Sequence, residues 1–305
     1  MIRTVLVPLD GSTLAERALP VAFDIARRTG GAVHLVRAHA PLAIIGATSE
    51  GIVTQDMLAA DDLMRKRAKE YLDETASRLG AEWGVRVVPH VDDGSAAGLI
   101  TQVADDVLAD IVVMTTHGQG GFAPGWLGSV ADGVIRHSYR PVLALPENDE
   151  SGGEPLAIRS IMVTLDGSAG SMAIIPPVRD LALVFGAEVH LVRVVAPYVP
   201  MDVVTTLTAS QPDRDDIDSE AVQAKHELDG YVTSLEASGR RATATVLVQL
   251  SPPRALLDHV KETDPDCIAI ATQGRGISRL FVGSVADKLI RSAGRPTLVL
   301  RPPKT

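Results

Sequence analysis

The sequence contains little of what several classes of protein require. Its 305 residues include one cysteine, Cys267, and only 3% aromatic side chains. A single cysteine forms no disulfide within the chain, and its place in the apolar run 267–271 favours a small buried residue over a reactive thiol. We therefore expect a fold without covalent crosslinks and a reducing compartment, the cytoplasm.

Two further absences concern partners. No apolar run approaches the about 20 residues of a membrane helix, and the first residues read as a strand, so we expect neither a membrane span nor a signal peptide. The net charge is -9 and lysine and arginine do not cluster, which disfavours a nucleic-acid surface. The few aromatic side chains also disfavour stacking on single strands. The sequence predicts a soluble protein with no membrane and no nucleic-acid partner.

What the sequence does contain is an internal duplication. The segment 4–12 returns at 161–168, and the segment 128–132 returns at 283–287. The spacing is 156 positions at Asp10 and Asp166, and it becomes 155 after a glycine-rich stretch. A period this long indicates a duplicated domain rather than a short repeat. We expect two domains, 1–151 and 152–305, joined by the polar, proline-containing and glycine-containing linker 146–155.

Each half alternates short apolar runs with longer helical patterns, which is typical of a parallel sheet covered by helices. Right-handed crossovers then give a doubly wound, Rossmann-like α/β domain with five parallel strands in each half. The expected strands are 4–9, 33–38, 85–91, 111–115 and 142–145 in the first half and 161–165, 189–194, 244–249, 267–271 and 297–300 in the second. The expected helices of the first half are 14–28, 55–79, 97–108 and 129–137.

The loop after the fourth strand is the first candidate site. The segment 115–118, Thr-Thr-His-Gly, is followed by nine residues with further glycines, and Gly128-Ser129 then begins a helix. Glycines let the backbone approach a ligand, and a helix N-terminus offers unpaired N–H groups to an anion. The loop has neither a Walker lysine nor the dinucleotide glycine spacing. Alternatively, Ser129 is only an N-cap and the glycines only give flexibility. Recurrence in register favours an anion site.

The second candidate site is the end of the first strand, where Asp10 and Asp166 stand in equivalent places. This is the carboxyl edge, at which open α/β sheets bind ligands. A carboxylate there can accept a hydrogen bond from a ribose hydroxyl or reach a metal. Alternatively, it closes an Asx-turn and caps the next helix together with Gly11 and Ser12. Combined with the anion site, it favours a nucleotide.

These features together resemble the universal stress protein family, in its tandem form and in the subclass that binds ATP. The family loop reads G-x2-G-x9-G-S/T, which Gly118, nine intervening residues and Gly128-Ser129 match, with Thr115 in the first glycine position. The resemblance extends over nearly all of both halves. It implies the strand order 3-2-1-4-5 and a bound ATP with Mg²⁺ or Mn²⁺.

The second half departs further from the family loop. Ala271 stands in the first glycine position, Gln273 replaces His117, and eight residues separate Gly274 from Gly283. The resemblance implies two sites, of which the second holds its phosphate less well. The implied binding residues are Pro8, Asp10, Arg37, Ala38, Thr115, His117, Gly118, Gly128, Ser129 and Val130, and then Leu165, Asp166, Arg193, Val194, Ala271, Gly274, Gly283, Ser284 and Val285.

The function implied by the resemblance is a nucleotide-dependent regulator of a stress response or of signalling. Catalysis has weaker support, because His117 and His137 have Gln273 and Ala293 as counterparts and no catalytic or metal-ligand spacing repeats. An enzyme that hydrolyses ATP slowly or transfers its phosphate stays open as an alternative. So do a nucleotide-independent interaction scaffold and a homodimer or another protein partner.

Overall fold

The structure, a computed structural model, describes residues 1–41, 54–117, 127–147, 156–197, 214–272 and 283–302. Its contacts divide the chain into two compact units, Met1–Ala157 with Pro296–Thr305, and Ile158–Arg295. The expected domain boundary at 151 and 152, and the expected linker beyond residue 147, lie outside the described residues. The two domain ranges therefore stay predictions.

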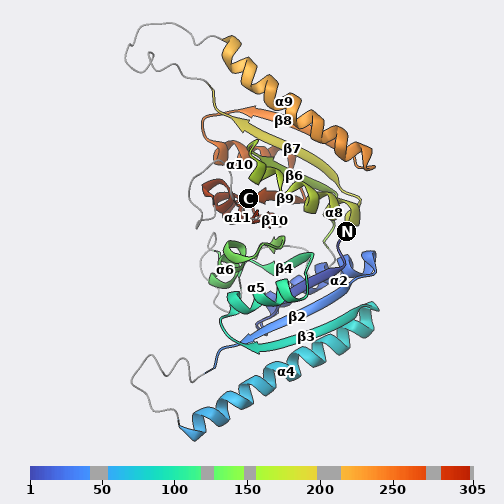
Figure 1. Ribbon diagram of the computed structural model, residues 1–305, viewed down its shortest axis with the longest axis vertical. Helices are drawn as coiled ribbons and strands as arrows, with labels where there is room; N and C mark the ends of the chain where they lie inside the picture. The colour runs from blue at the N-terminus through green and yellow to red at the C-terminus, as the bar shows by residue number, and fades with distance from the viewer. Residues whose placement is uncertain (42–53, 118–126, 148–155, 198–213, 273–282, 303–305) are drawn as a thin grey trace. The chain divides into compact units, whose positions relative to one another are not determined.

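Six strands lie in the described part of the first unit, and most of them are labelled in Figure 1. They are β1 (Thr4–Pro8), β2 (Ala32–His39), β3 (Arg86–Asp93), β4 (Ile111–Thr115), β5 (Val142–Leu145) and β10 (Thr297–Leu300). The order β3-β2-β1-β4-β5 consists of parallel pairs, which confirms the predicted order 3-2-1-4-5. β10, expected as the last strand of the second half, runs antiparallel to β5 in this unit.

In the described part of the first unit, five helices connect these strands. They are α1 (Thr13–Glu16), α2 (Ala18–Thr29), α4 (Gln55–Trp83), α5 (Ala96–Asp106) and α6 (Ser129–His137). The single helix expected over 14–28 is wrong, because the N–H of Arg17 donates to the carbonyl of Leu14 at 3.2 Å and tightens the turn between α1 and α2. Right-handed crossovers put α2 and α4 on one face and α5 and α6 on the other.

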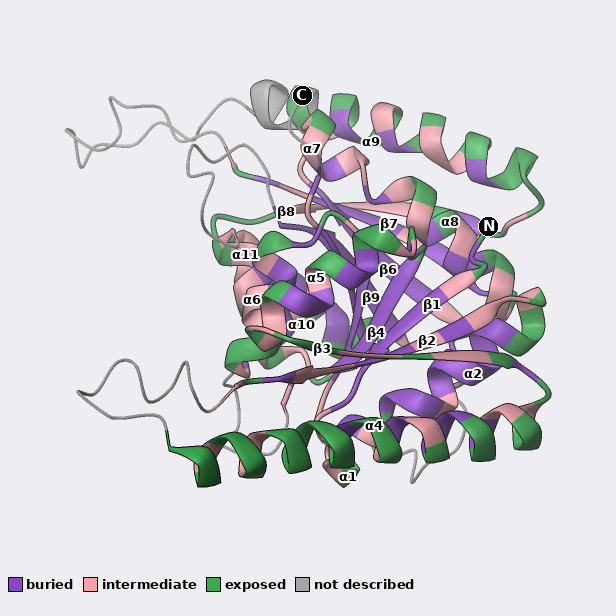
Figure 2. Ribbon diagram, turned by 60° about the horizontal axis from the view of Figure 1, so that its bottom comes forward, coloured by how far each residue is buried: buried purple, intermediate pink, exposed green. Residues whose placement is uncertain are grey.

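The core of the first unit lies between the sheet and these helices (Figure 2). All five residues of β4 are buried, as the apolar pattern predicts for a strand with both faces covered. α4 buries only one stripe, in which Ala68, Leu72, Thr75, Ala76 and Leu79 recur at helical spacing. Each large apolar side chain buried in this way stabilises the fold by about 1.5 to 3 kcal/mol.

The second unit repeats this arrangement, with four strands of its own among its described residues. The strands are β6 (Ser160–Leu165), β7 (Glu188–Val195), β8 (Ala242–Val248) and β9 (Cys267–Ala271), and the helices are α7 (Ala169–Met172), α8 (Ile175–Phe185), α9 (Arg214–Ala237), α10 (Pro252–Thr263) and α11 (Ser284–Ser292). The order β9-β6-β7-β8 is parallel throughout. β8 begins two residues before the expected 244, because Gly239, with φ of 78°, turns the chain immediately after α9.

Asp110 and its counterpart Asp266 hold the start of the first strand of their halves. The Asp110 carboxylate accepts hydrogen bonds from the N–H groups of Arg3 and Thr4, at 2.7 and 2.9 Å. Asp266 accepts in the same way from two successive N–H groups at the start of β6, at 2.8 and 3.0 Å. Both aspartates fix the amino end of the first strand, opposite the edge where ligands are expected. Within the described residues, no helix combines the length and hydrophobicity needed to cross a membrane.

Candidate nucleotide site

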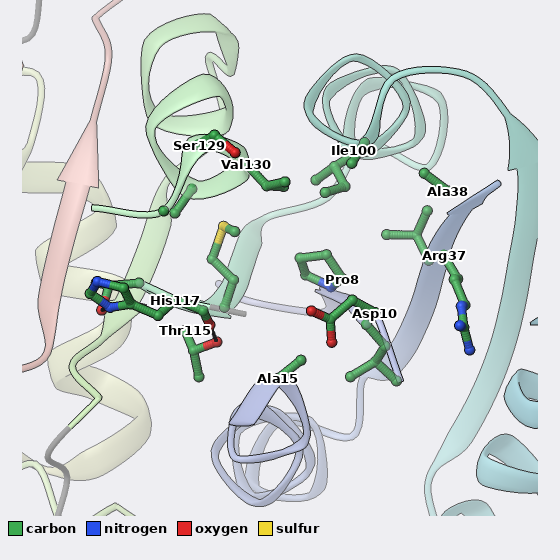
Figure 3. Close-up of a pocket in the computed structure, with 17 residues that line it drawn as sticks. Pro8, Asp10, Ala15, Arg37, Ala38, Ile100, Thr115, His117, Ser129 and Val130 are labelled. Carbon is green, nitrogen blue, oxygen red and sulfur yellow. Dashed lines mark hydrogen bonds between the residues drawn. The ribbon is translucent and has the colours of Figure 1, made fainter. Parts of the chain in front are cut away.

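A cavity of about 390 Å³ lies at the carboxyl ends of β1, β2 and β4 in the first unit (Figure 3). At this point the strand order reverses, because the crossovers from β1 to β2 and from β3 to β4 pass on opposite faces of the sheet. Side chains and backbone from α1, α5 and α6 complete the lining. The doubly wound sheet therefore places the cavity where polar groups at the ends of the strands and at the starts of the helices lie close together.

Nine of the predicted first-half residues line this cavity. They are Pro8, Asp10, Arg37, Ala38, Thr115, His117, Gly128, Ser129 and Val130. The tenth, Gly118, lies outside the described residues. The fold thus brings together residues that are separated by up to 122 positions in the sequence, from Pro8 to Val130. Their contact with a ligand stays a prediction.

The turn after β1 fixes Asp10 at the cavity. Oδ1 of Asp10 accepts hydrogen bonds from the Ser12 N–H at 2.8 Å and from the Ser12 hydroxyl at 2.6 Å. The same hydroxyl accepts from the N–H of Ala15 at 3.1 Å and caps α1. Gly11 provides the positive φ of 87° that this turn requires. The Asx-turn considered as the alternative is thus present, and it also holds the carboxylate beside Pro8 and Ala15 (Figure 3).

The start of α6 forms the opposite wall. Gly128 donates its N–H to the carbonyl of Thr116 at 2.8 Å, and a Cβ at this position would lie 3.0 Å from the same oxygen. Only glycine therefore fits without a shift of the strand end. As the N-cap residue, Gly128 has no side chain to accept the N–H groups of the first turn. Ser129 and Val130 thus bring the positive end of the helix dipole to the cavity (Figure 3).

His117 lines the cavity from the end of β4. Its side chain is 10% exposed, and Nδ1 lies 3.0 Å from Oγ1 of Thr116 and 4.0 Å from the carboxylate of Glu147. Among the described residues, its Nε2 has no hydrogen-bond partner. The ring is directed away from Asp10 (Figure 3), so these two titratable groups do not form an acid–base pair.

A cluster that the sequence reasoning missed lies beside the Asp10 turn. The guanidinium of Arg37 packs 3.0 to 3.3 Å from the position of a Cβ on Gly11 and lies 5.1 Å from the centroid of the Tyr71 ring. The Tyr71 hydroxyl donates to Glu16 at 2.6 Å. Burial, and then this hydrogen bond, raise the pKa of Tyr71 far above its ordinary value. Tyr71 thus joins α4 to α1 beneath the turn.

The second unit builds the same turn with a different partner. Arg193 packs 2.8 Å from the Cβ position of Gly167, and its Nη1 forms an ion pair with Glu227 at 2.5 Å. Glu227 stands 156 positions after Tyr71, so the period of the duplication could have found this exchange. Arg37 therefore stacks on the Tyr71 ring in the first unit, whereas its counterpart Arg193 forms an ion pair with Glu227 in the second.

The other predicted residues of the second half take the corresponding places. Leu165 and Asp166 end β6, and Ser168 donates to Asp166 from its N–H at 2.9 Å and its hydroxyl at 2.6 Å. Gly283 donates to the Thr272 carbonyl at 2.9 Å. The remaining residues lie in β7, at the end of β9 and in the first turn of α11: Arg193, Val194, Ala271, Ser284 and Val285. Gly274 lies outside the described residues.

The apolar part of the cavity was not anticipated. Ala15, Val36, Ala96, Ile100, Met114 and Ala131 line it between the polar residues. In the sequence they read as core positions of strands and helices, and nothing in their spacing separates a cavity wall from a packed interior. Among the described residues, no group of three or more histidine, cysteine, aspartate or glutamate side chains could hold a metal ion.

This combination of a doubly wound sheet, a cavity at the reversal of strand order and an open helix N-terminus defines a Rossmann-like fold with a candidate ligand site. The chain belongs to the universal stress protein family. The sequence profile of that family matches residues 1–146 and again residues 157–301. The tandem arrangement expected from the duplication is thereby confirmed.

Individual relatives agree with this assignment. A universal stress protein of Methanocaldococcus jannaschii is 28% identical over 145 residues, which cover 48% of this chain and 82% of that protein. One from Mycobacterium tuberculosis is 23% identical over 315 positions, with 98% of this chain and 95% of that protein covered. The crystal structure of a universal stress protein from Archaeoglobus fulgidus superposes with a TM-score of 0.68 at 18% identity, over 98% of this chain and 96% of that one. The last likeness concerns the fold alone.

Proposed function

We propose that this universal stress protein binds ATP in the cavity of its first unit and that the bound nucleotide regulates a stress or signalling response. The supporting observation is the composition of this single cavity. It joins one acidic side chain, an uncapped helix start and an apolar wall in a volume of about 390 Å³. Small-molecule sites are typically concave and largely apolar, with a few convergent polar groups, in volumes of about 300 to 1,000 Å³.

The phosphates belong at the start of α6 in this proposal. The N–H groups of Ser129 and Val130 lack a side-chain acceptor from the N-cap, since that residue is Gly128. A phosphate supplies the missing acceptor and is stabilised by the helix dipole. The close approach of Gly128 to Thr116 holds this helix start in place.

The nucleoside belongs between the ends of β1 and β2. Asp10 has its carboxylate oriented by Ser12, which prepares it to accept a ribose hydroxyl without a change of rotamer. Adenine then packs on the apolar wall that includes Ile100 and Met114, with the backbone of Ala38 at its edge. A divalent ion bound with ATP would neutralise phosphate charge, and Asp10 is the acidic residue of the described lining that could reach it.

A regulatory role is favoured over turnover by the arrangement of the titratable groups. His117 is directed away from Asp10, and Asp10 already accepts two hydrogen bonds within its own turn. The described lining therefore provides binding groups rather than an aligned base and nucleophile. Slow hydrolysis and phosphate transfer are tested by measuring product formation alongside binding.

Val130→Asp tests the proposed site, with Val285→Asp in α11 as the matched control. An aspartate in the first turn of a helix stabilises the helix, yet a second negative charge there opposes a phosphate. We expect Val130→Asp to keep the melting temperature of the free protein and to weaken ATP binding about 10-fold to 100-fold by calorimetry. Val285→Asp should leave the tighter site unchanged. Unaltered affinity in Val130→Asp would place ATP elsewhere.

Mass spectrometry provides an independent test. Small molecules released by denaturing the purified protein should include an adenine nucleotide. If titration also shows no binding of ATP at millimolar concentration, the protein is a nucleotide-independent scaffold.

A further inference from the structure

β8 is the edge strand of the second unit, and among the described residues it pairs on one side only, with β7. An edge strand exposes unpaired N–H and C=O groups, which can pair with another chain. Proteins commonly protect such edges with proline, charged side chains or bulges in the strand, or with a helix or loop that covers it. A helix packs against the edge strand in both units, α4 against β3 and α9 against β8, so the units can differ only in the strands themselves. The two units of this chain differ in this protection.

The edge strand of the first unit, β3, carries both kinds of protection. Pro89 lies opposite Leu35 in its middle, and Asp92 and Asp93 close its carboxyl end. All three are exposed. A proline removes an N–H donor, and the carboxylates repel an identical strand that pairs in parallel.

β8 has none of these features. In register with the neighbouring strand, Ala244 replaces Pro89, while Leu247 and Val248 replace Asp92 and Asp93. The whole strand reads Ala-Thr-Ala-Thr-Val-Leu-Val, without a charge. Val248 is 41% exposed, and Leu250 just beyond the strand is 72% exposed. This edge combines high β-propensity with exposed apolar groups.

We propose that the outer edge of β8 pairs antiparallel with β8 of a second copy of this chain, about a twofold axis at Thr245. This register places Ala244 opposite Val246 and Thr243 opposite Leu247, each pair occurring twice. Small, β-branched and apolar pairs of this kind stabilise antiparallel strands, and no like charges meet. In the dimer, the unpaired N–H and C=O groups of each β8 edge form hydrogen bonds with β8 of the other copy.

The surroundings of β8 also favour a second copy over a charged partner. Arg241, the nearest cation at the amino end, forms an ion pair with Glu188 of β7, so its charge is compensated within the unit. Gln249 at the other end is uncharged and would face Arg241 of the partner in this register. An acidic or basic peptide would find no complementary charge along this strand, whereas an identical strand needs none.

Analytical ultracentrifugation of the full chain tests the dimer. The native protein should show a reversible monomer–dimer equilibrium. Val248→Asp introduces the residue type of Asp93, which has the same register in β3. This variant should raise the dissociation constant by about tenfold or more, because the carboxylate is placed within the paired edge. Leu183→Asp on α8 is the control, since Leu183 is 45% exposed and lies outside β8. A monomer at all concentrations, or a dimer equally stable in both variants, would overturn the proposal.

A crosslink locates the axis. Thr245→Cys places two thiols opposite one another in the proposed pair, whereas the native Cys267 is buried and does not interfere. Oxidation should give a covalent dimer with Thr245→Cys and none with His90→Cys, the residue in the same register on β3. If only His90→Cys gave covalent dimers, the interface would lie away from β8. The same conclusion would follow if neither variant gave them although the native protein is dimeric.

Discussion

Asp10 accepts both hydrogen bonds of Ser12 through one carboxylate oxygen, Oδ1, and Asp166 accepts both hydrogen bonds of Ser168 in the same way. The two aspartates therefore have the same structural role. A difference between them in nucleotide affinity would have to come from the rest of each site.

Asp10→Ala and Asp166→Ala should each lower the free energy of unfolding by about 0.5 to 2 kcal/mol, because each removes the acceptor of a helix-capping turn. Asp10→Ala should in addition weaken ATP binding by about 1 to 3 kcal/mol, if the carboxylate accepts a ribose hydroxyl. Urea denaturation without ligand and calorimetry with ATP separate the two effects. An affinity of the folded Asp10→Ala protein equal to that of the native protein would limit Asp10 to the turn.

Gly118→Val and Gly274→Val test the unequal loops of the two halves. Both glycines lie outside the described residues, so this prediction comes from the sequence. A β-branched residue resists the backbone approach to phosphate, and the second loop is one residue shorter with Ala271 at its first glycine position. Calorimetry should find only the weaker site in Gly118→Val and the tighter site in Gly274→Val. A misplaced donor costs about 1 kcal/mol or more. Equal affinities would show that loop length is no handicap.

Stability should depend on pH through a histidine pair. His34 Nδ1 lies 2.9 Å from His90 Nε2, and burial lowers the pKa of both rings below the ordinary 6.5, with a further lowering of the His34 pKa by His90 and Arg86. The unfolded chain then binds protons more readily than the folded one. Stability is complete above about pH 6.5 and declines as the pH falls through that value toward the folded pKa.

His90→Thr, which introduces the residue of the same register in β8, should flatten the fall of the melting temperature between about pH 7.5 and 5.5. A remainder should persist, because the pKa of His190 is also lowered, by burial and by His259. Far-ultraviolet circular dichroism at several pH values is the measurement. An unchanged slope would assign the acid sensitivity to other groups.

Glu227→Gln should destabilise the protein more than Tyr71→Phe. Arg193 is only 6% exposed on its side chain, so the loss of the Glu227 charge leaves a buried cation poorly compensated, at a cost of about 1 to 3 kcal/mol. Tyr71→Phe keeps the ring under Arg37 and loses the hydrogen bond to the Glu16 carboxylate. This bond is worth about 1.5 kcal/mol, the low end for a charged acceptor, because Glu16 is partly exposed and regains water. Chemical denaturation compares the two. The reverse order would mean that solvent compensates Arg193.

The elements of the fold could be predicted wherever the sequence pattern has a local cause. The buried strand 111–115 and the Gly128 helix start follow from hydrophobic pattern and backbone chemistry, and both have the expected bounds. The break at Arg17 could not be predicted, since it depends on one tightened turn within a continuous helical pattern. Nor could the pairing of β10 with β5, because strand pairing between distant segments depends on the packing of the whole chain.

The sequence motifs predicted the polar residues of the candidate site but not the side chains that pack around them. Asp10 and Gly128 stand out because they recur and have turn chemistry. Tyr71 and Glu227 occupy equivalent places but differ in residue type, and a search for recurring residues therefore passes over both. The apolar wall with Ile100 and Met114 was hidden for a different reason, since a side chain that faces a cavity and one that faces a packed core obey the same periodicity.

The antiparallel pairing of β10 with β5 also sets an order of events during synthesis. Val142 finds its partner only after Val299, which lies 157 positions further along the chain, has left the ribosome. A nascent chain that stops at residue 295 has the five parallel strands of the first unit but leaves the outer edge of β5 without β10. Limited proteolysis of ribosome-bound chains should accordingly show that protection of β5 rises once Thr297–Leu300 have left the ribosome. The described strand that covers the outer edge of β5 is therefore synthesised later than all four described strands of the second unit.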